Sequence, residues 1–450
     1  MVPRVSRRMS TLKRTAVDLA RRVVAILPRS AAGRRGRLAV DGGTPVRDIR
    51  LRPWPANHRT SLAAWFTSVE PKFRAVFLSG IEGLPQTRQQ AFAARWADLC
   101  QCRHALLLPH GTDALRFAIA AVLDHDGLQY GGEVIVPNLS FIATATAALD
   151  RRCGIALVDV DPGTLNLDPA AVEAAIVPGQ TRAIMPVHQF GQPADMTAIL
   201  AVAQRHGLRV IEDAAQAHGA MWKDRPVGGF GDAGAFSFQS AKNLSAGEGG
   251  ILTTNDTGVY ERAHALHNAG RAPKDGARWE HHSLGWNCRP TEYQAVLLEE
   301  RLSGFAEQQE HRRARWADLL RALSGIDCVS PLALQPGVTR HGMYMFVLRY
   351  HAERCGGAAI DRFVAAVQAE GAPIHRGYAS TIADQPVMRG LLARRPRYVR
   401  VLPTPAADQA AREILYIPGN AFLTDGQDMQ DIADAIRKVQ TALSVSEPSR

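Results

Sequence analysis

Short apolar runs alternate with alanine-rich segments along most of this chain. Runs that are apolar throughout are typical of parallel strands buried on both faces, and the segments between them have the composition of helices. The alternation therefore predicts an α/β fold, with a large, mostly parallel sheet and helices on both of its faces. The predicted strands lie at residues 105–108, 134–136, 155–158, 183–187, 208–211, 235–238 and 251–253.

The regular alternation of predicted strands and helices ends in the last third of the chain. A helical pattern covers residues 291–323, after which strands at 344–350 and 413–417 are interspersed with helices at 358–370 and 428–442. This order predicts a smaller α+β domain after the large one. We expect a basic N-terminal arm at residues 1–37, a large domain at 38–325, a small C-terminal domain at 326–443 and a tail at 444–450.

The net charge of +10 belongs to the N-terminal arm. Residues 1–37 hold eleven Lys or Arg against a single acid, Asp18, whereas the rest of the chain holds 42 basic and 42 acidic residues. A balanced body gives no charge-based reason to expect a nucleic acid partner, and no clear patch for a diphosphate.

Residues 11–27 of the arm have the periodicity of an amphipathic helix, with aliphatic residues on one face and Lys and Arg on the other. Two interpretations stay open. The arm is either a solvated extension, with translation starting at Met9, or a helix that lies on an anionic membrane or on a partner.

The six cysteines do not have the paired spacing of a metal site, so we expect no metal. They are typical of the reduced thiols of a cytoplasmic protein. No apolar stretch approaches the length that spans a bilayer, and no signal-peptide cleavage site follows a short apolar core. We therefore expect a cytoplasmic location.

Two of the predicted strands end close to residues that can carry cofactor chemistry. Asp213 ends the run that starts at Leu208, and Lys242 follows the run at 233–238 after a short polar turn. A lysine amine can form a Schiff base with an aldehyde, and a buried carboxylate can keep a pyridine nitrogen protonated. The pair is the smallest set of residues that pyridoxal phosphate chemistry requires. An Asp at a strand end is, however, also common as a helix cap, and a Lys after a strand is commonly a solvated side chain.

Longer segments around this pair resemble the DegT/DnrJ/EryC1/StrS family of sugar and cyclitol aminotransferases. Residues 210–220, VIEDAAQAHGA, are similar to the family's segment at the pyridine nitrogen, and residues 231–250, GDAGAFSFQSAKNLSAGEGG, to its lysine segment. The resemblance extends from about Leu38 to Gln440. It implies the type I fold of pyridoxal-phosphate-dependent transferases, with pyridoxal 5'-phosphate as cofactor and with Asp213 and Lys242 as the catalytic residues.

The resemblance also implies a phosphate site. Gly111 and Thr112 open a helix after the first strand, where backbone amides and the helix dipole favour an anion. In the family this position holds the cofactor phosphate, and Ser237 supplies a hydroxyl to it. Asn287 is similar to an asparagine that reaches the phosphate from the neighbouring subunit, which implies a homodimer with shared active sites.

The cofactor ring has its own implied contacts. Phe141 matches the aromatic residue that stacks on the pyridine face, and Gln216 lies where the family places a side chain against the opposite face or the ring hydroxyl. His218 could support Asp213 from behind, and we interpret His188 as a structural residue.

The substrate contacts are less well defined by the sequence. Arg271 and Arg289 are candidates for the carboxylate of the amino donor, and each could equally form a salt bridge. The chain departs from the family pattern near its C-terminus, where many relatives carry a histidine after the strand-end proline and this chain has Gly419 and Asn420 after Pro418.

The implied activity moves an amino group from L-glutamine or L-glutamate to a keto-cyclitol or keto-sugar, in the biosynthesis of secondary metabolites or surface saccharides. The segments at 38–47 and 239–250 resemble both the scyllo-inosose aminotransferases and the aminohydroxybenzoate synthases, so a dehydrating aromatase stays an alternative. A nucleotide-linked keto-sugar as acceptor is another. The remaining one, a catalytically silent regulatory relative, is disfavoured by the intact Asp213 and Lys242.

Overall fold

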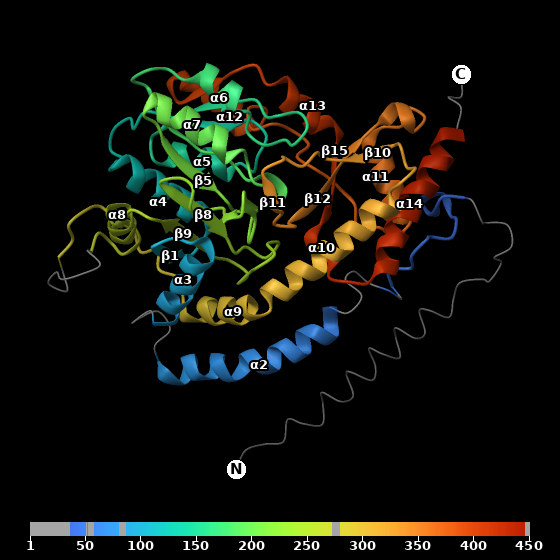
Figure 1. The fold of residues 1–450 in the computed structure, drawn as a ribbon, viewed down its shortest axis with the longest axis horizontal. Helices are drawn as coiled ribbons and strands as arrows, with labels where there is room; N and C mark the ends of the chain where they lie inside the picture. Colours follow the sequence, from blue (N-terminus) through green and yellow to red (C-terminus); the bar gives the residue numbers. More distant parts are fainter. Residues whose placement is uncertain (1–36, 51, 53–57, 81–86, 272–279, 446–450) are drawn as a thin grey trace, which may run out of the picture.

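The computed structural model describes residues 37–445 apart from 51, 53–57, 81–86 and 272–279, and its centre is one large sheet (Figure 1). The helix predicted at 11–27 lies outside the described residues. Among the residues that are described, no helix combines the length and the apolar character needed to cross a membrane.

Among the described residues, the large sheet has eight strands, of which seven share one direction and β9 alone runs in the opposite direction. The predicted mainly parallel sheet is therefore confirmed. Four of its strands are buried along their whole length, as their continuous apolar sequences indicate. In spatial order the strands are β1 (His104–Leu108), β9 (Gly250–Thr254), β8 (Ala233–Ser237), β5 (Arg209–Asp213), β4 (Thr181–Ile184), β2 (Glu133–Pro137), β3 (Gly154–Val158) and β14 (Val399–Val401).

Helices cover both faces of this sheet because alternate strand residues point to opposite sides. Val134 and Val136 pack into a core with α4, α5 and α8, whereas Ile135 packs into a core with α6 and α7. A third core joins α3 and α9 to the β1 side of the sheet. The helices are α3 (Thr87–Cys100), α4 (Gly111–Leu123), α5 (Ala143–Asp150), α6 (Pro169–Ala175), α7 (Met196–His206), α8 (Thr257–His267) and α9 (Glu292–Ser303).

A smaller unit follows, and α10 (Phe305–Ala322) runs from the large sheet into it (Figure 1). Its antiparallel sheet has the order β10-β12-β15-β13 and shares one core with α10, α11 and α14. The predicted α+β character of this part is confirmed. The elements are β10 (Val329–Pro331), β12 (Met345–Tyr350), α11 (Ile360–Ala369), β13 (His375–Arg376), α13 (Pro405–Glu413), β15 (Ile414–Pro418) and α14 (Gly426–Val445).

The remaining elements are additions that the sequence patterns did not predict. Helix α2 (His58–Ser79) packs on α9 through Val69, Val76 and Val296 (Figure 1). The strands β6 (Met221–Trp222), β7 (Arg225–Pro226) and β11 (Val338–Arg340) form a small separate sheet. Helix α12 (Pro386–Arg394) precedes β14.

Two segments cross the predicted boundary at residue 325. Leu38 belongs to the core of the smaller unit, and the buried carboxylate of Glu370 accepts hydrogen bonds from the backbone amides of Ala39 at 2.7 Å and Val46 at 3.0 Å. In the other direction, β14 returns to the edge of the large sheet beside β3. The division into two domains stays a prediction. The segment at Leu38 packs in the smaller unit and β14 packs in the large sheet, although the predicted boundary would place each in the other domain.

Candidate active site

A cavity of about 650 Å³ opens at the carboxyl ends of β1, β2, β5 and β8. In a sheet of this kind, the loops that follow the strands are the usual place for a ligand. The smaller unit closes the cavity with Tyr344 and Tyr378. Seven of the predicted cofactor residues line it: Gly111, Thr112, Phe141, Asp213, Gln216, Ser237 and Lys242.

Asp213 is a buried carboxylate at the end of β5, and each of its two oxygens accepts a hydrogen bond. The hydroxyl of Thr144 donates to Oδ2 at 2.7 Å, and the backbone amide of Ala215 donates to Oδ1 at 3.2 Å. Ser140 extends this series of hydrogen bonds, since its hydroxyl lies 2.9 Å from that of Thr144. Burial raises the pKa of Asp213, while these hydrogen bonds oppose the rise. A cation placed beside this carboxylate would be strongly favoured.

The amine of Lys242 lies in the same cavity. Burial lowers its pKa to about 8, and the negative charge of Asp213 works in the opposite direction. Its Nζ donates a hydrogen bond to the hydroxyl of Tyr344 at 3.3 Å and lies 4.3 Å from the centre of that ring. A half-buried lysine with a lowered pKa is a candidate nucleophile and proton carrier.

The amino end of α4 also lines the cavity and is a candidate anion site. The side chain of the N-cap residue His110 makes no capping hydrogen bond, so within the described structure the first amides of the helix are left for a ligand or water. Gly111 allows the close approach of Ser237, because a Cβ at residue 111 would lie 2.7 Å from the Cβ of Ser237. The helix end, its uncapped amides and the Ser237 hydroxyl together suit a phosphate.

Gln216 and Phe141 border the middle of the cavity. Gln216 Nε2 donates to the hydroxyl of Tyr378 at 3.1 Å, and its Oε1 accepts from the amide of Phe190 at 2.8 Å. These bonds fix the amide side chain. Phe141 is 60% exposed although it is a large apolar side chain. An exposed aromatic ring at the edge of a cavity is free to stack on a flat ligand.

The comparison with known families decides the class of the protein. The model of the DegT/DnrJ/EryC1/StrS aminotransferase family matches residues 73–437. The chain belongs to this family. It is therefore an aminotransferase, an enzyme that moves an amino group from a small-molecule donor to a carbonyl acceptor.

Individual relatives match over nearly their whole length. The L-glutamine:2-deoxy-scyllo-inosose aminotransferase of Micromonospora echinospora is 36% identical over 416 residues, which is 89% of this chain and 97% of the relative. The L-glutamine:scyllo-inosose aminotransferase of Streptomyces griseus is 36% identical over 419 residues, with the same coverage of 89% and 97%. The crystal structure of 3-amino-5-hydroxybenzoic acid synthase is similar with a TM-score of 0.73 at 31% identity, covering 84% of this chain and 97% of that one.

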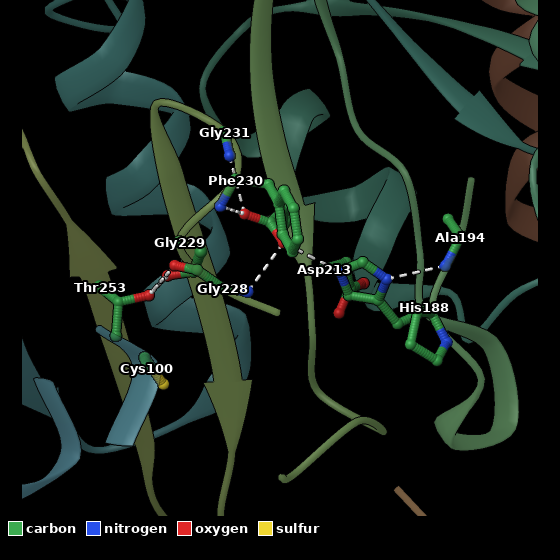
Figure 2. A network of polar contacts seen from close by, with 12 residues as sticks. Cys100, His188, Ala194, Asp213, Gly228, Gly229, Phe230, Gly231 and Thr253 are labelled. Carbon is green, nitrogen blue, oxygen red and sulfur yellow. Dashed lines mark hydrogen bonds and ion pairs between the residues drawn. The ribbon is translucent and has the colours of Figure 1, made fainter. Parts of the chain in front are cut away.

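A buried network holds the end of β5 in place for this aminotransferase site (Figure 2). The carboxylate of Glu212 accepts from the amides of Gly228 at 2.7 Å, Phe230 at 2.6 Å and Gly231 at 2.8 Å. His188 Nε2 lies 3.1 Å from the same carboxylate, and its Nδ1 accepts from the amide of Ala194 at 3.0 Å. These contacts support our interpretation of His188 as structural. They fix the residue next to Asp213 rather than Asp213 itself.

His218 has a different position from the one we expected. Its ring lies among Trp96, Phe236 and Phe238, with centroid separations between 5.7 and 5.9 Å. Burial lowers its pKa to about 3. Within the described part of the chain, no hydrogen bond joins it to Asp213. Thr144 supports Asp213 instead.

Three predicted residues do not line the cavity. Asn287 is exposed and pairs through its backbone with Asn268, whose side-chain oxygen also accepts from Arg289 Nη1 at 3.0 Å. Arg271 belongs to the same pair of segments. A contact of Asn287 with the cofactor phosphate would therefore require a second subunit, and that contact stays a prediction.

Sequence reasoning missed Thr144, Tyr344 and Tyr378. Thr144 stood in a segment that matched the family, and its spacing of three residues from Phe141 was an available signal. The tyrosines come from the smaller unit, and nothing in their spacing connects them with β5 or β8. The chain departs from the family pattern at Gly419, which follows Pro418 where many relatives carry a histidine. This departure has a steric reason, because a Cβ at Gly419 would lie 2.3 Å from the carbonyl oxygen of Met343.

Proposed function

We propose that this chain is a pyridoxal-phosphate-dependent aminotransferase that gives the amino group of L-glutamine or L-glutamate to a keto-cyclitol. The observation that carries the chemistry is a single cavity containing half-buried Lys242, buried Asp213 and the uncapped end of α4. The relatives that use L-glutamine and an inosose support the choice of donor and acceptor. The product would serve the biosynthesis of a secondary metabolite or a surface saccharide.

The residues of the cavity fit the proposed cofactor. The α4 amides and Ser237 would hold its phosphate, Asp213 its pyridine nitrogen, Phe141 its ring face and Lys242 its aldehyde carbon. When bound, pyridoxal phosphate supplies an electron sink for the negative charge that develops at the Cα of the amino donor. Asp213 would favour the protonated pyridine because its own negative charge is buried, and a cation beside it offsets the cost of that burial.

Lys242 is the group that moves the proton in this proposal. Its Nζ would accept the proton from Cα of the donor and deliver it to the former aldehyde carbon of the cofactor, as a general acid–base. A pKa of about 8 leaves a useful fraction of the amine neutral near neutral pH. The Tyr344 hydroxyl, which accepts a hydrogen bond from Nζ at 3.3 Å, orients the amine between these positions.

A homodimer with shared sites is part of the proposal. The exposure of Asn287 and its absence from the lining of its own cavity support a contact across a subunit boundary.

The likeness to 3-amino-5-hydroxybenzoic acid synthase supports a second candidate, a dehydrating reaction that yields an aromatic product. A nucleotide-linked keto-sugar would use the same cofactor site. The products separate these alternatives.

The test is a pair of half-reactions followed by the absorbance of the bound cofactor. L-glutamine or L-glutamate should convert the aldehyde form to the amine form, and scyllo-inosose or its 2-deoxy analogue should restore it. Lys242→Ala should remove both conversions, while the surface variant Lys223→Ala should keep them. Preference for a nucleotide-linked keto-sugar over every free ring ketone would overturn the proposed acceptor, and an aromatic product would favour the second candidate.

A further inference from the structure

A second cavity, of about 710 Å³, lies at the other end of the large sheet. Its walls include Glu133 at the start of β2, Arg182 in β4 and Val399 at the start of β14. It shares no lining residue with the candidate active site, which opens at the carboxyl ends of the strands. A strand of five residues separates these ends by about 16 Å.

The walls of this cavity carry three guanidinium groups, those of Arg182, Arg397 and Arg400, against the single carboxylate of Glu133. Glu133 is buried, and Arg400 binds it through two nitrogens at 2.6 and 2.9 Å. Thr181 at 3.2 Å and Gln180 at 3.3 Å also donate to it. Its charge is thus matched by Arg400, and its lone pairs are occupied.

The other two arginines keep their charge unmatched. Within the described residues, no carboxylate pairs with Arg182 or Arg397. The Arg397 guanidinium lies over the ring of Tyr130, 4.0 Å from its centre. A Cβ at Gly132 would lie 2.4 Å from Cγ of Arg182, so glycine at this position lets the arginine stem pass against the backbone. The Arg397 guanidinium and the Arg182 stem therefore have defined supports, while both side chains remain exposed to a ligand.

The surrounding surface adds to the positive potential. Residues 385–403, which include α12 and β14, contain five arginines and no acidic residue. The charge balance of the whole body concealed this patch, because the net charge averages the run at 385–403 with acidic residues elsewhere, and Arg182 joins that run only in the folded sheet. Positive potential in a cleft attracts anions more strongly than the same charge on a flat surface.

We propose that this cavity binds a phosphorylated small molecule with at least two negative charges, such as a phosphate ester or a diphosphate. Guanidinium groups match phosphate oxygens in a two-pronged geometry that ammonium groups lack. Arg182 and Arg397 bind the anion, and the Arg400–Glu133 pair forms the wall that holds β2 and β14 together. This inference does not depend on the proposed acceptor or on the transamination itself.

The test is calorimetric titration of the cofactor-loaded enzyme with pyrophosphate at low ionic strength. Loading fills the phosphate site at α4, so the titration reports a different site. We expect one pyrophosphate per chain, and affinity weakened at least about tenfold in Arg182→Ala and in Arg397→Ala. Arg397→Lys keeps the positive charge but loses the two-pronged geometry of the guanidinium group, so it should weaken pyrophosphate binding less than Arg397→Ala does.

The matched control is Arg389→Ala, which removes an exposed arginine from α12 outside the cavity lining and should bind pyrophosphate as the wild type does. Equal affinity in the wild type, Arg182→Ala and Arg397→Ala would overturn the proposal, as would equal weakening in Arg389→Ala. Binding of a short single-stranded RNA much more tightly than pyrophosphate, lost in the same two variants, would replace the small molecule by a nucleic acid. The absorbance of the bound cofactor and the unfolding curve show whether each variant is folded.

Discussion

At the scale of single residues, we expect the charge state of Lys242 to set the pH dependence of cofactor uptake. Burial disfavours the ammonium form and brings the pKa down to about 8, so the neutral amine gains population as the pH rises through that value. We expect the rate of cofactor uptake by cofactor-free enzyme to rise with pH and to reach half its maximum near pH 8. A rate that still rises steeply beyond pH 10, as for a solvated lysine, would contradict this.

Thr144 is a positioning residue for Asp213. Its hydroxyl stabilises the ionised carboxylate, so its removal should raise the pKa of Asp213 further and move the acidic limb of the activity profile to higher pH. Thr144→Val should lower kcat/KM about ten- to hundredfold, the value of one hydrogen bond to a charged group. Thr144→Ser keeps the hydroxyl and should recover most of the loss. An unchanged acidic limb in Thr144→Val would show that the bond has no such role.

At the scale of elements, the contact between Gly419 and the segment before β12 positions Tyr344. A Cβ at Gly419 would approach the carbonyl oxygens of Met343 at 2.3 Å and Tyr344 at 2.7 Å, which are backbone atoms that cannot simply rotate away. We expect Gly419→Ala to lower the free energy of unfolding by about 1 to 3 kcal/mol, measured with urea. Gly304→Ala is the control, since a Cβ there meets only the end of Gln308 at 3.8 Å. Equal stability of the two variants would contradict the steric account.

The elements that the sequence predicted well are those whose pattern depends on burial alone. Continuous apolar runs identified β2, β3 and β8, and the helical pattern at 291–323 identified the region of α9 and α10, although not the break between these helices at Gly304. The short edge strand β14 has only three residues, and its assignment to the large sheet depends on a tertiary contact with β3. Local periodicity contains no information about such a partner.

The candidate site likewise contains residues that the sequence predicted and residues that depend on a tertiary contact. Asp213, Lys242 and Gly111 follow strands of one sheet, so their convergence follows from the parallel order. Tyr344 and Tyr378 reach the cavity only because the smaller unit packs over it. The arginine cavity is the clearest failure of sequence reasoning, because overall neutrality concealed a local excess of charge at Arg182 and Arg397.

At the scale of the whole molecule, the proposed sharing of active sites between subunits has a direct test. Lys242→Ala and Asn287→Ala chains should each be inactive or nearly so, and their mixture should recover partial activity through one repaired site per heterodimer. The recovery should require subunit exchange, which differently tagged chains report. Proven exchange without any recovery would contradict a shared site.

The central claim is that the cavity around Lys242 and Asp213 transfers nitrogen from an amino acid to a ring ketone. The most direct measurement supplies L-glutamine labelled with ¹⁵N at its α-amino group together with scyllo-inosose or its 2-deoxy analogue, and follows the label by mass spectrometry. We predict a ring amine that carries ¹⁵N with the wild type and with Lys223→Ala, and none with Lys242→Ala. An unlabelled amine, or a labelled amine formed at the normal rate by Lys242→Ala, would contradict the account.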